Sequence, residues 1–443
     1  MPSVPVPAAG DYPPAALAWA VCIVLFLAYI LSFVDRGIMG ILAAQIEADF
    51  HIGDVQFSLL QGFSFAVFYA GFGLPIAWLV DTRQRGPVVA LGILVWSLAT
   101  ALCGLCQNFT QIFLCRIGVG AGEAALLPGA TSILKDCFPR ARRGLPLGVF
   151  AAGLFLGSAG AGLGAAAILH RIGASTPVIP FFGPLSPWRC VMLVVGAAGL
   201  PVVVLAALIR IPRRNPGRLS GGLFEFGPMI ALYRARGRAL WLHHLGFTAV
   251  CFASYAVMSW LPLIFIRQYG WTVPQIGGML GVVTLVTGPL GSLTGGALAD
   301  FYARRGADDG KMRVGLLSAV GMFVPALLFG FLPVATLSVL LLALFSFFSS
   351  FIWGLAPGSL QEIVPDSVLG RVTAFYTAVV NLVAMSLGPL STALIARLFS
   401  GPEALAHAIS IVVPAGALAA ALGFYFCRAP YRTAVAAASA NSQ

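Results

Sequence analysis

Twelve runs of about 20 mostly apolar residues follow one another along this chain of 443 residues, and each is long enough to cross a bilayer as a helix. Only 9% of the residues are charged, against roughly a quarter in soluble proteins. This composition excludes a soluble multidomain enzyme, a disordered protein and a disulfide scaffold. We therefore expect an all-α polytopic membrane protein, with spans at about 17–44, 57–80, 86–105, 111–134, 145–168, 188–209, 240–266, 275–299, 314–332, 336–360, 372–398 and 404–427.

The net charge of +11 describes topology once the basic residues are sorted by loop. Of the 26 Lys and Arg residues, Arg36 and Arg116 lie within spans and four fall in the odd-numbered loops (Arg171, Arg189, Arg267 and Arg397). The remaining 20 lie in the even-numbered loops and the C-terminal tail. Because positively charged loops stay in the cytoplasm, both termini are predicted to be cytoplasmic. The positive charge is explained by this topology, so nucleic-acid binding is not expected.

The chain reads as two halves with one plan. A stretch at 210–239, rich in Arg, Pro and Gly, separates six spans from six. Gln56 precedes Asp81 by the same distance at which Gln275 precedes Asp300. Two further segments, 134–139 and 360–365, also match. The predicted organisation is a cytoplasmic tail (1–16), an N-terminal six-helix bundle (17–209), a cytoplasmic linker (210–239), a C-terminal six-helix bundle (240–427) and a second cytoplasmic tail (428–443). Parallel six-span repeats are typical of a transporter with its site between the halves.

Three motifs carry a resemblance to the major facilitator superfamily. The loop after span eight reads Gly296-Ala-Leu-Ala-Asp300-Phe-Tyr-Ala-Arg304-Arg305, and the loop after span two keeps Asp81 and Arg85 of the same pattern. Span four contains Arg116-Ile-Gly118-Val-Gly120-Ala-Gly122. The chain resembles the spinster-like branch more narrowly, through Phe33-Val34-Asp35-Arg36, Arg116–Ala124 and Trp188-Arg189. The resemblance implies the major facilitator fold, and that branch includes lysophospholipid and sphingosine-1-phosphate exporters and members described as proton-linked.

Four charged residues lie well inside spans, where a charge costs at least about 2.5 kcal/mol: Asp35, Arg36, Arg116 and Glu123. By helical rise, Asp35, Arg116 and Glu123 lie about 13, 8 and 18 Å below the outer ends of their spans. The four therefore form a net-neutral cluster if spans one and four face each other, and the resemblance implies that both spans line the central cavity. We expect proton coupling or substrate binding here, although a buried pair that only joins two helices is the alternative.

The C-terminal half carries no such charges and offers aromatic and polar side chains instead: Tyr255, Trp260, Trp353 and Asn381. A cavity that is charged on one side and aromatic on the other suits an amphipathic substrate, although aromatic residues within spans also serve packing. His243 and His244 fall at the start of span seven and are expected to form a solvated cap.

A gating latch is predicted at the cytoplasmic ends of the spans. Carboxylates there would pair with Arg or with a helix N-terminus when that side is shut. The candidates are Asp81, Arg85, Asp300, Arg304 and Arg305, with Arg143, Glu362, Asp136 and Arg371 as partners from neighbouring loops.

These features predict a monomeric secondary transporter of a bacterial inner membrane, working by alternating access and coupled to protons. Its substrate would be an amphipathic or anionic small molecule such as a lysolipid; the alternative is a small organic anion such as a sugar acid or aromatic acid. A non-transporting sensor on the same fold also stays open. No metal-ligand spacing, cofactor motif or catalytic motif is visible in the sequence, so neither metal, cofactor nor enzyme activity is expected.

Overall fold

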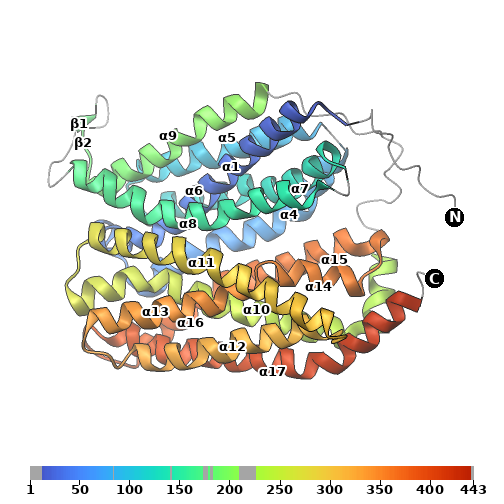
Figure 1. Cartoon of the computed structure of the whole chain (residues 1–443). Coiled ribbons are helices and arrows are strands. Elements are labelled where there is room, and N and C mark those ends of the chain that lie inside the picture. Colours follow the sequence, from blue (N-terminus) through green and yellow to red (C-terminus); the bar gives the residue numbers. More distant parts are fainter. Residues whose placement is uncertain are drawn as a thin grey trace.

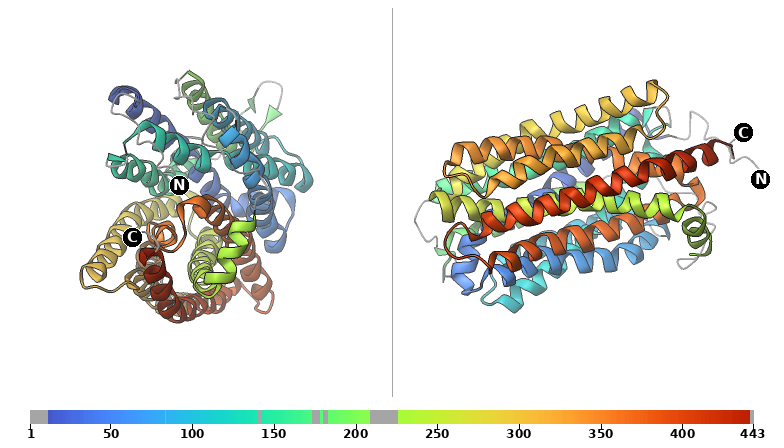
Figure 2. Two further views of the ribbon diagram at one scale, coloured as in Figure 1. Left: turned by 90° about the vertical axis from the view of Figure 1, so that its right-hand side faces the viewer. Right: turned by 90° about the horizontal axis from the view of Figure 1, so that it is seen from below.

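The computed structural model is built from long helices that run along one common direction (Figure 1). It describes residues 12–82, 84–139, 142–172, 178–179, 183–208 and 226–440. Within these residues, twelve helical spans are long and apolar enough to cross a membrane, which confirms the predicted number. The spans form two six-helix bundles, drawn from blue to green and from yellow-green to red in Figures 1 and 2.

The N-terminal bundle contains the first six spans, with short additional elements between them. Its elements are α1 (Ala15–Ile41), α2 (Ala43–Phe50), α3 (Asp54–Ser58), the π-helical turn η2 (Leu59–Phe63), α4 (Ser64–Thr82), α5 (Arg85–Cys103), α6 (Phe109–Glu123), α7 (Leu126–Cys137), α8 (Gly144–Ile172), β1 (Val178–Ile179), β2 (Gly183–Pro184) and α9 (Pro187–Leu208). The two strands pair antiparallel in the loop between the fifth and sixth spans.

The C-terminal bundle repeats this plan. Its elements are α10 (Gly227–Tyr269), α11 (Val273–Arg304), α12 (Gly310–Phe329), α13 (Ala335–Ser349), the 3₁₀ turn η5 (Ser350–Ile352), α14 (Leu355–Ile363), α15 (Asp366–Val379), the π-helical turn η6 (Val380–Met385), α16 (Ser386–Ala396) and α17 (Ala404–Ala440). We call the end of the molecule where α1 begins and α17 ends the terminal face, and the opposite end, with β1 and β2, the hairpin face (Figure 1).

Spans four and ten are each interrupted at corresponding places. Span four changes from α6 to α7 directly after Glu123, and Pro128-Gly129 follow in the first turn of α7. Span ten changes from α13 to α14 in the same way, ahead of Pro357-Gly358. Proline fits best in the first turn of a helix, where the backbone N–H that it lacks would have no partner within the helix, so each Pro-Gly pair favours a new helix start. The interruption places Glu123 at a helix end inside the membrane span.

Two helices extend beyond the apolar runs that predict them. α10 begins at Gly227, inside the stretch expected to be the linker, and has a non-helical conformation at Arg236. α17 continues through the expected tail to Ala440. Hydropathy detects only the apolar part of a helix, whereas the hydrogen-bonded backbone continues through charged residues. Residues 210–225 of the expected linker lie outside the described part of the chain.

Glycines allow the two bundles to approach closely. α8 and α11 lie side by side between the bundles (Figure 1), and a side chain at either Gly162 or Gly277 would collide with the backbone carbonyl of the other. Spans two and eleven meet at their π-helical turns, where a side chain at Gly62 would collide with the Met385 carbonyl. Such contacts between small residues let helix backbones pack tightly inside a membrane.

Candidate functional site

The charged residues of span one and span four meet through Arg36 and Glu123. Arg36 Nε lies 2.8 Å from Glu123 Oε2, and the same oxygen accepts a hydrogen bond of 2.7 Å from Ser32 Oγ. The Glu123 side chain is fully buried and that of Arg36 is 12% exposed. This ion pair joins α1 to the end of α6, so the expected approach of spans one and four is present in the structure.

Asp35 and Arg116 are buried in the same region, and each has buried polar atoms that make no hydrogen bond to the described residues. Asp35 Oδ1, Arg116 Nε and Nη2, and Glu123 Oε1 all lack a hydrogen-bond partner in the described part of the chain. Asp35 lies within electrostatic range of Glu123, Arg116 and Arg36. Buried polar groups are almost always hydrogen-bonded, so four such atoms in one cluster mark a place where further polar chemistry can be accommodated.

Aromatic rings surround the arginines of this cluster. The Arg36 guanidinium carbon lies 5.1, 4.8 and 5.2 Å from the ring centres of Phe33, Phe65 and Tyr69, and Arg116 lies 5.5 Å from that of Phe65. Cation–π contacts partly replace hydration of a buried guanidinium. Ser32, Phe65 and Tyr69 are not among the residues expected from the sequence, although helical spacing puts Ser32 one turn before Arg36.

The four candidates of the C-terminal half have different environments. Tyr255, on α10, lies within electrostatic range of Arg36, so the two bundles meet at this point. Trp260 is fully buried, donates from Nε1 to the Pro389 carbonyl at 2.9 Å and packs against Phe57, which is a packing environment. Asn381 is buried in η6 and donates to the Thr377 carbonyl, whereas Trp353 is 37% exposed. Only Tyr255 is brought to the charged cluster.

Several of the predicted latch residues pair within one bundle at the terminal face. Arg85 contacts Asp136 at 2.6 Å, and Arg143 donates to the Phe138 carbonyl. Glu362 pairs with Lys311 and accepts from the Tyr431 hydroxyl. The side chain of Asp81 lies outside the described part, and Arg371 lies near the start of α15. The expected role of these residues in gating stays a prediction.

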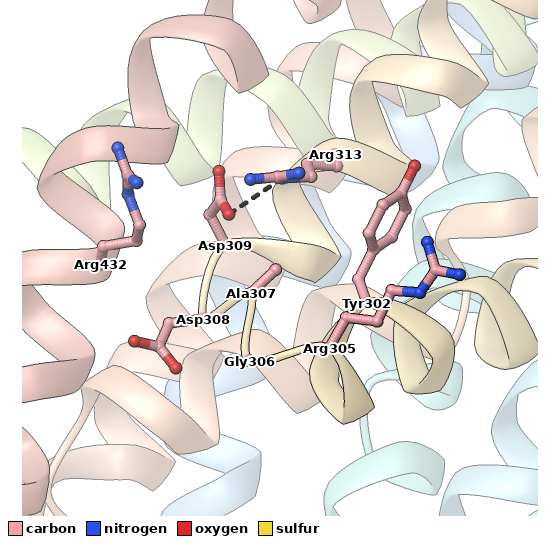
Figure 3. Close-up of a pocket in the computed structure, with 8 residues that line it drawn as sticks. All are labelled: Tyr302, Arg305, Gly306, Ala307, Asp308, Asp309, Arg313 and Arg432. Atoms are coloured by element: carbon pink, nitrogen blue, oxygen red, sulfur yellow. Dashed lines mark hydrogen bonds and ion pairs between the residues drawn. The ribbon is translucent and has the colours of Figure 1, made fainter.

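The loop that carries the second copy of the family motif borders a pocket of about 450 Å³ at the terminal face (Figure 3). Asp300, Arg304 and Arg305 are exposed, and Arg305 stacks on Phe301 at 4.1 Å. Asp309, which no sequence motif marks, pairs with Arg313 at 3.0 Å and Arg428 at 2.7 Å. Burial alone would raise the pKa of Asp309, but the two arginines hold it below its usual value.

Ion pairs between the bundles lie at the hairpin face. Arg267, at the end of α10, contacts Glu47 at 2.9 Å and Asp54 at 2.7 Å, and both acids belong to the N-terminal bundle. Nearby, Asp49 accepts from Trp188 Nε1 and pairs with Arg189 at 3.0 Å. The available signal in the sequence was that three acids fall in one loop and face the few arginines of the same side.

The comparisons with known proteins agree with this architecture. A model of the Major Facilitator Superfamily matches residues 25–389, most of the chain. The chain belongs to the Major Facilitator Superfamily. It is 27% identical over 429 residues to an "MFS-type efflux pump" of Mycolicibacterium smegmatis, covering 94% of each chain. It is 25% identical over 418 residues to a probable L-galactonate transporter of Escherichia coli, covering 90% of this chain and 87% of that one.

A solved structure shares the fold of this facilitator. It is the crystal structure of a bacterial homolog of the human lysosomal transporter Spinster, in an inward-facing and unoccupied conformation. The TM-score is 0.77 at 23% identity, over 96% of this chain and 98% of that one. The predicted family and the likeness to spinster-like proteins are therefore confirmed. The protein is a transporter rather than an enzyme, integral to a bacterial-type inner membrane.

The histidines of this transporter's seventh span are not a solvated cap. His243 and His244 are 0% and 2% exposed, because α10 continues well before them and Tyr376 and Phe375 of α15 pack on their rings. Ser359 donates to the Ala356 carbonyl, so His243 Nε2 must donate to Ser359. His244 Nδ1 then donates to His243 Nδ1, and Tyr233 donates to His244 Nε2. Every ring nitrogen is satisfied with both histidines neutral.

The hairpin-face cluster of the transporter predicts a pH-dependent opening. Burial raises the pKa of Glu47 from 4.5 to about 8, and Asp54 acts in the same direction although Arg267 opposes it. If opening this face exposes Glu47 to water, its pKa returns towards 4.5. Between these two values Glu47 is protonated while the face is closed, so that Arg267 forms its ion pair with Asp54 and only a hydrogen bond with Glu47. Opening releases this proton, so rising pH weakens the closed face.

The measurement is the distance between spin labels at Gln107 and Leu398, which are exposed at the hairpin face on different bundles. The widely separated population is expected to grow as the pH rises from 4.5 to 8. Glu47→Gln, which cannot titrate, should show the same distribution throughout. An unchanged pH dependence in Glu47→Gln would assign the effect to another group.

Proposed function

We propose that this facilitator is a secondary active transporter that moves an amphipathic or anionic small molecule by alternating access, coupled to protons. The observation that carries the proposal is the buried cluster of Asp35, Arg36, Arg116 and Glu123, in which several atoms lack a partner among the described residues. Intramembrane ionisable groups are costly and usually mark substrate or ion pathways. A second ion-paired cluster closes the hairpin face, consistent with access from the terminal face in this conformation.

Each charged residue has a distinct proposed role. Asp35 binds and releases the coupled proton, because its carboxylate is buried and Oδ1 accepts no hydrogen bond from the described residues. Arg116 binds an anionic group of the substrate through Nε and Nη2, which a phosphate or carboxylate fits in a bidentate manner. Arg36 and Glu123 hold spans one and four together, with Glu123 as a second titrating group.

The aromatic residues around the cluster favour a substrate with an apolar part beside its charge. Phe33, Phe65 and Tyr69 flank Arg36, and Tyr255 approaches from the other bundle. A lysolipid of the kind suggested by the spinster-like resemblance has this character. The alternative is a small organic anion, which the likeness to a probable L-galactonate transporter favours. Trp260, Trp353 and Asn381 remain cavity candidates for other conformations.

We further propose that the terminal face is cytoplasmic and that the latch residues pair across the bundles when it closes. In that state Asp81, Asp300 and their neighbouring arginines would exchange partners, and the Arg267 pairs would separate. The tails (1–16 and 428–443) and the linker (210–239) would be cytoplasmic, with the transporter working as a monomer.

Purified protein in proteoliposomes tests this function. An outward or inward proton gradient should drive uptake of one member of a panel containing lysophospholipids, sugar acids and aromatic acids. Competition for binding to the purified protein separates the two substrate classes. A labelled member of the transported class should be displaced by other members of that class and not by members of the other class. Absence of accumulation for every compound, together with specific binding of one of them, would instead favour a sensor.

A further inference from the structure

A second cavity lies in the outer wall of the C-terminal bundle, away from the charged cluster. It encloses about 550 Å³, within the range of about 300–1,000 Å³ typical of small-molecule sites. Helices α10, α16 and α17 line it together with η6 and the end of α15. The lining residues are Trp241, His244, Leu245, Thr248, Ala249, Phe252, Val379, Val383, Ser391, Ile395, Val412, Ala415, Gly416 and Ala419. We call this cavity the lateral groove.

The lateral groove opens at the surface that faces lipid in a membrane-spanning bundle. Leu245 and Val383 on its walls are 48% and 38% exposed, and Ala415 is exposed beside them. From Val379 to Ile395 its wall rises by about 24 Å, which exceeds the depth of one leaflet of a hydrocarbon core about 30 Å thick. The length of this wall and its almost wholly apolar lining therefore fit one hydrocarbon chain of a bilayer lipid.

Aromatic and basic side chains lie at the terminal-face end of the groove. Trp241 and Phe375 meet edge to face with their ring centres 5.9 Å apart, and Tyr233 contacts both. Arg238 is exposed one turn before Trp241 on the same helix face, and Arg371 lies one turn before Phe375. Aromatic rings followed by arginines are typical of the level of lipid head groups, where a basic residue attracts anionic lipid.

Among the buried polar atoms that line the groove in the described part of the chain, one lacks a hydrogen-bond partner. Both ring nitrogens of His244 are used by Tyr233 and His243, so this wall is neutral. Thr248 Oγ1 is buried and has no hydrogen-bond partner among the residues that the structure describes. Thr248 lies about 15 Å along α10 from Arg238, at the depth of the acyl chain, so this one hydroxyl interrupts an otherwise apolar wall.

We propose that the lateral groove binds one acyl chain of an anionic phospholipid from the surrounding bilayer, with the phosphate at Arg238. The groove belongs to the C-terminal bundle, whereas Arg36, Arg116 and Glu123 belong to the N-terminal one, so the site is separate from the proposed transport site. The proposed lipid site therefore adds a ligand that the transport cycle itself does not need.

Native mass spectrometry of the purified protein tests the assignment without any transport assay. The protein is titrated with phosphatidylglycerol, with phosphatidylcholine carrying the same chains, and with glycerol phosphate, which has a head group and no chain. We expect saturable binding of one phosphatidylglycerol, weaker binding of phosphatidylcholine and none of glycerol phosphate. Arg238→Gln should weaken phosphatidylglycerol binding about fivefold, the effect of one basic residue near the surface.

Ala415→Phe fills the groove and should abolish the specific site, and Ala419→Phe on the next turn serves if the first variant does not fold. The matched control is Ala198→Phe, the same change at an exposed position of α9, which should bind like the wild type. Equal binding of the two phospholipids, or retention of the site in both groove variants, would overturn the proposal. The same spectra report the oligomeric state. If the wild type were dimeric and Ala415→Phe became monomeric while still binding the lipid, the groove would bind a second copy of the chain and the proposal would be overturned.

Discussion

Replacing Asp35 by Asn is expected to reduce proton-driven transport to the level of protein-free liposomes while leaving the fold intact. Asn has nearly the same shape but cannot bind and release a proton. Asp35 is 3% exposed, and its Oδ1 accepts no hydrogen bond from the described residues, so no ion pair of the fold is lost with its charge. The measurement is the initial rate of substrate uptake with and without an imposed pH gradient.

A second readout separates coupling from substrate binding in this variant. Exchange of labelled for unlabelled substrate needs no net proton movement, so Asp35→Asn should still exchange. The matched control is Asp308→Asn, the same change at an exposed position of the terminal face, which should retain proton-driven uptake. Wild-type rates of proton-driven uptake in Asp35→Asn would remove Asp35 from the coupling role and leave Glu123 as the candidate.

The sequence was sufficient to find the four charged residues because a charge inside an apolar run is visible without any structure. It could not assign the partners among them. Arg36 pairs with Glu123 and Asp35 pairs with neither arginine, although all four were expected at one level. The choice depends on side-chain direction around each helix, and residues 35 and 36 point about 100° apart on an α-helix.

Other parts of the site were hidden because their residues look like packing. Phe65 and Tyr69 are ordinary membrane residues until Arg36 is seen against their rings. Glu47 and Arg267 are far apart in the chain and lie at or beyond the ends of the apolar runs, so only the tertiary structure joins them. The burial of His243 and His244 is not visible in the sequence because hydropathy puts the start of span seven where the charges stop, while α10 begins at Gly227.

The number and length of the spans could be predicted from the sequence more easily than the contacts between them, for a physical reason. Backbone groups in lipid must be satisfied within the helix, so span number and length follow from hydropathy alone. The interruptions at Glu123 and at Pro357-Gly358 depend on local Pro and Gly chemistry, which the sequence displays but hydropathy averages away. The π-helical turns that join spans two and eleven have no comparable signal.

Glu123→Leu is expected to destabilise the transporter by about 3–5 kcal/mol, the cost of leaving a buried charge without its partner. Arg36 would lose its ion pair at 2.8 Å, and Ser32 would lose its acceptor, while both remain enclosed. Arg36→Met should cause a loss of similar size, since Glu123 then stays buried without a cation. The measurement is the free energy of unfolding in one detergent, at one pH, for each variant.

The double variant Arg36→Met/Glu123→Leu distinguishes a structural ion pair from two independent residues. When both charges of a buried pair are replaced by apolar groups, stability often returns close to the original value. We therefore expect the double variant to be more stable than either single one, with a coupling energy well above the roughly 0.5 kcal/mol seen for independent sites. Additive losses would show that the pair contributes no mutual stabilisation. A stable double variant that no longer transports would show that these two charges serve the transport cycle beyond joining spans one and four.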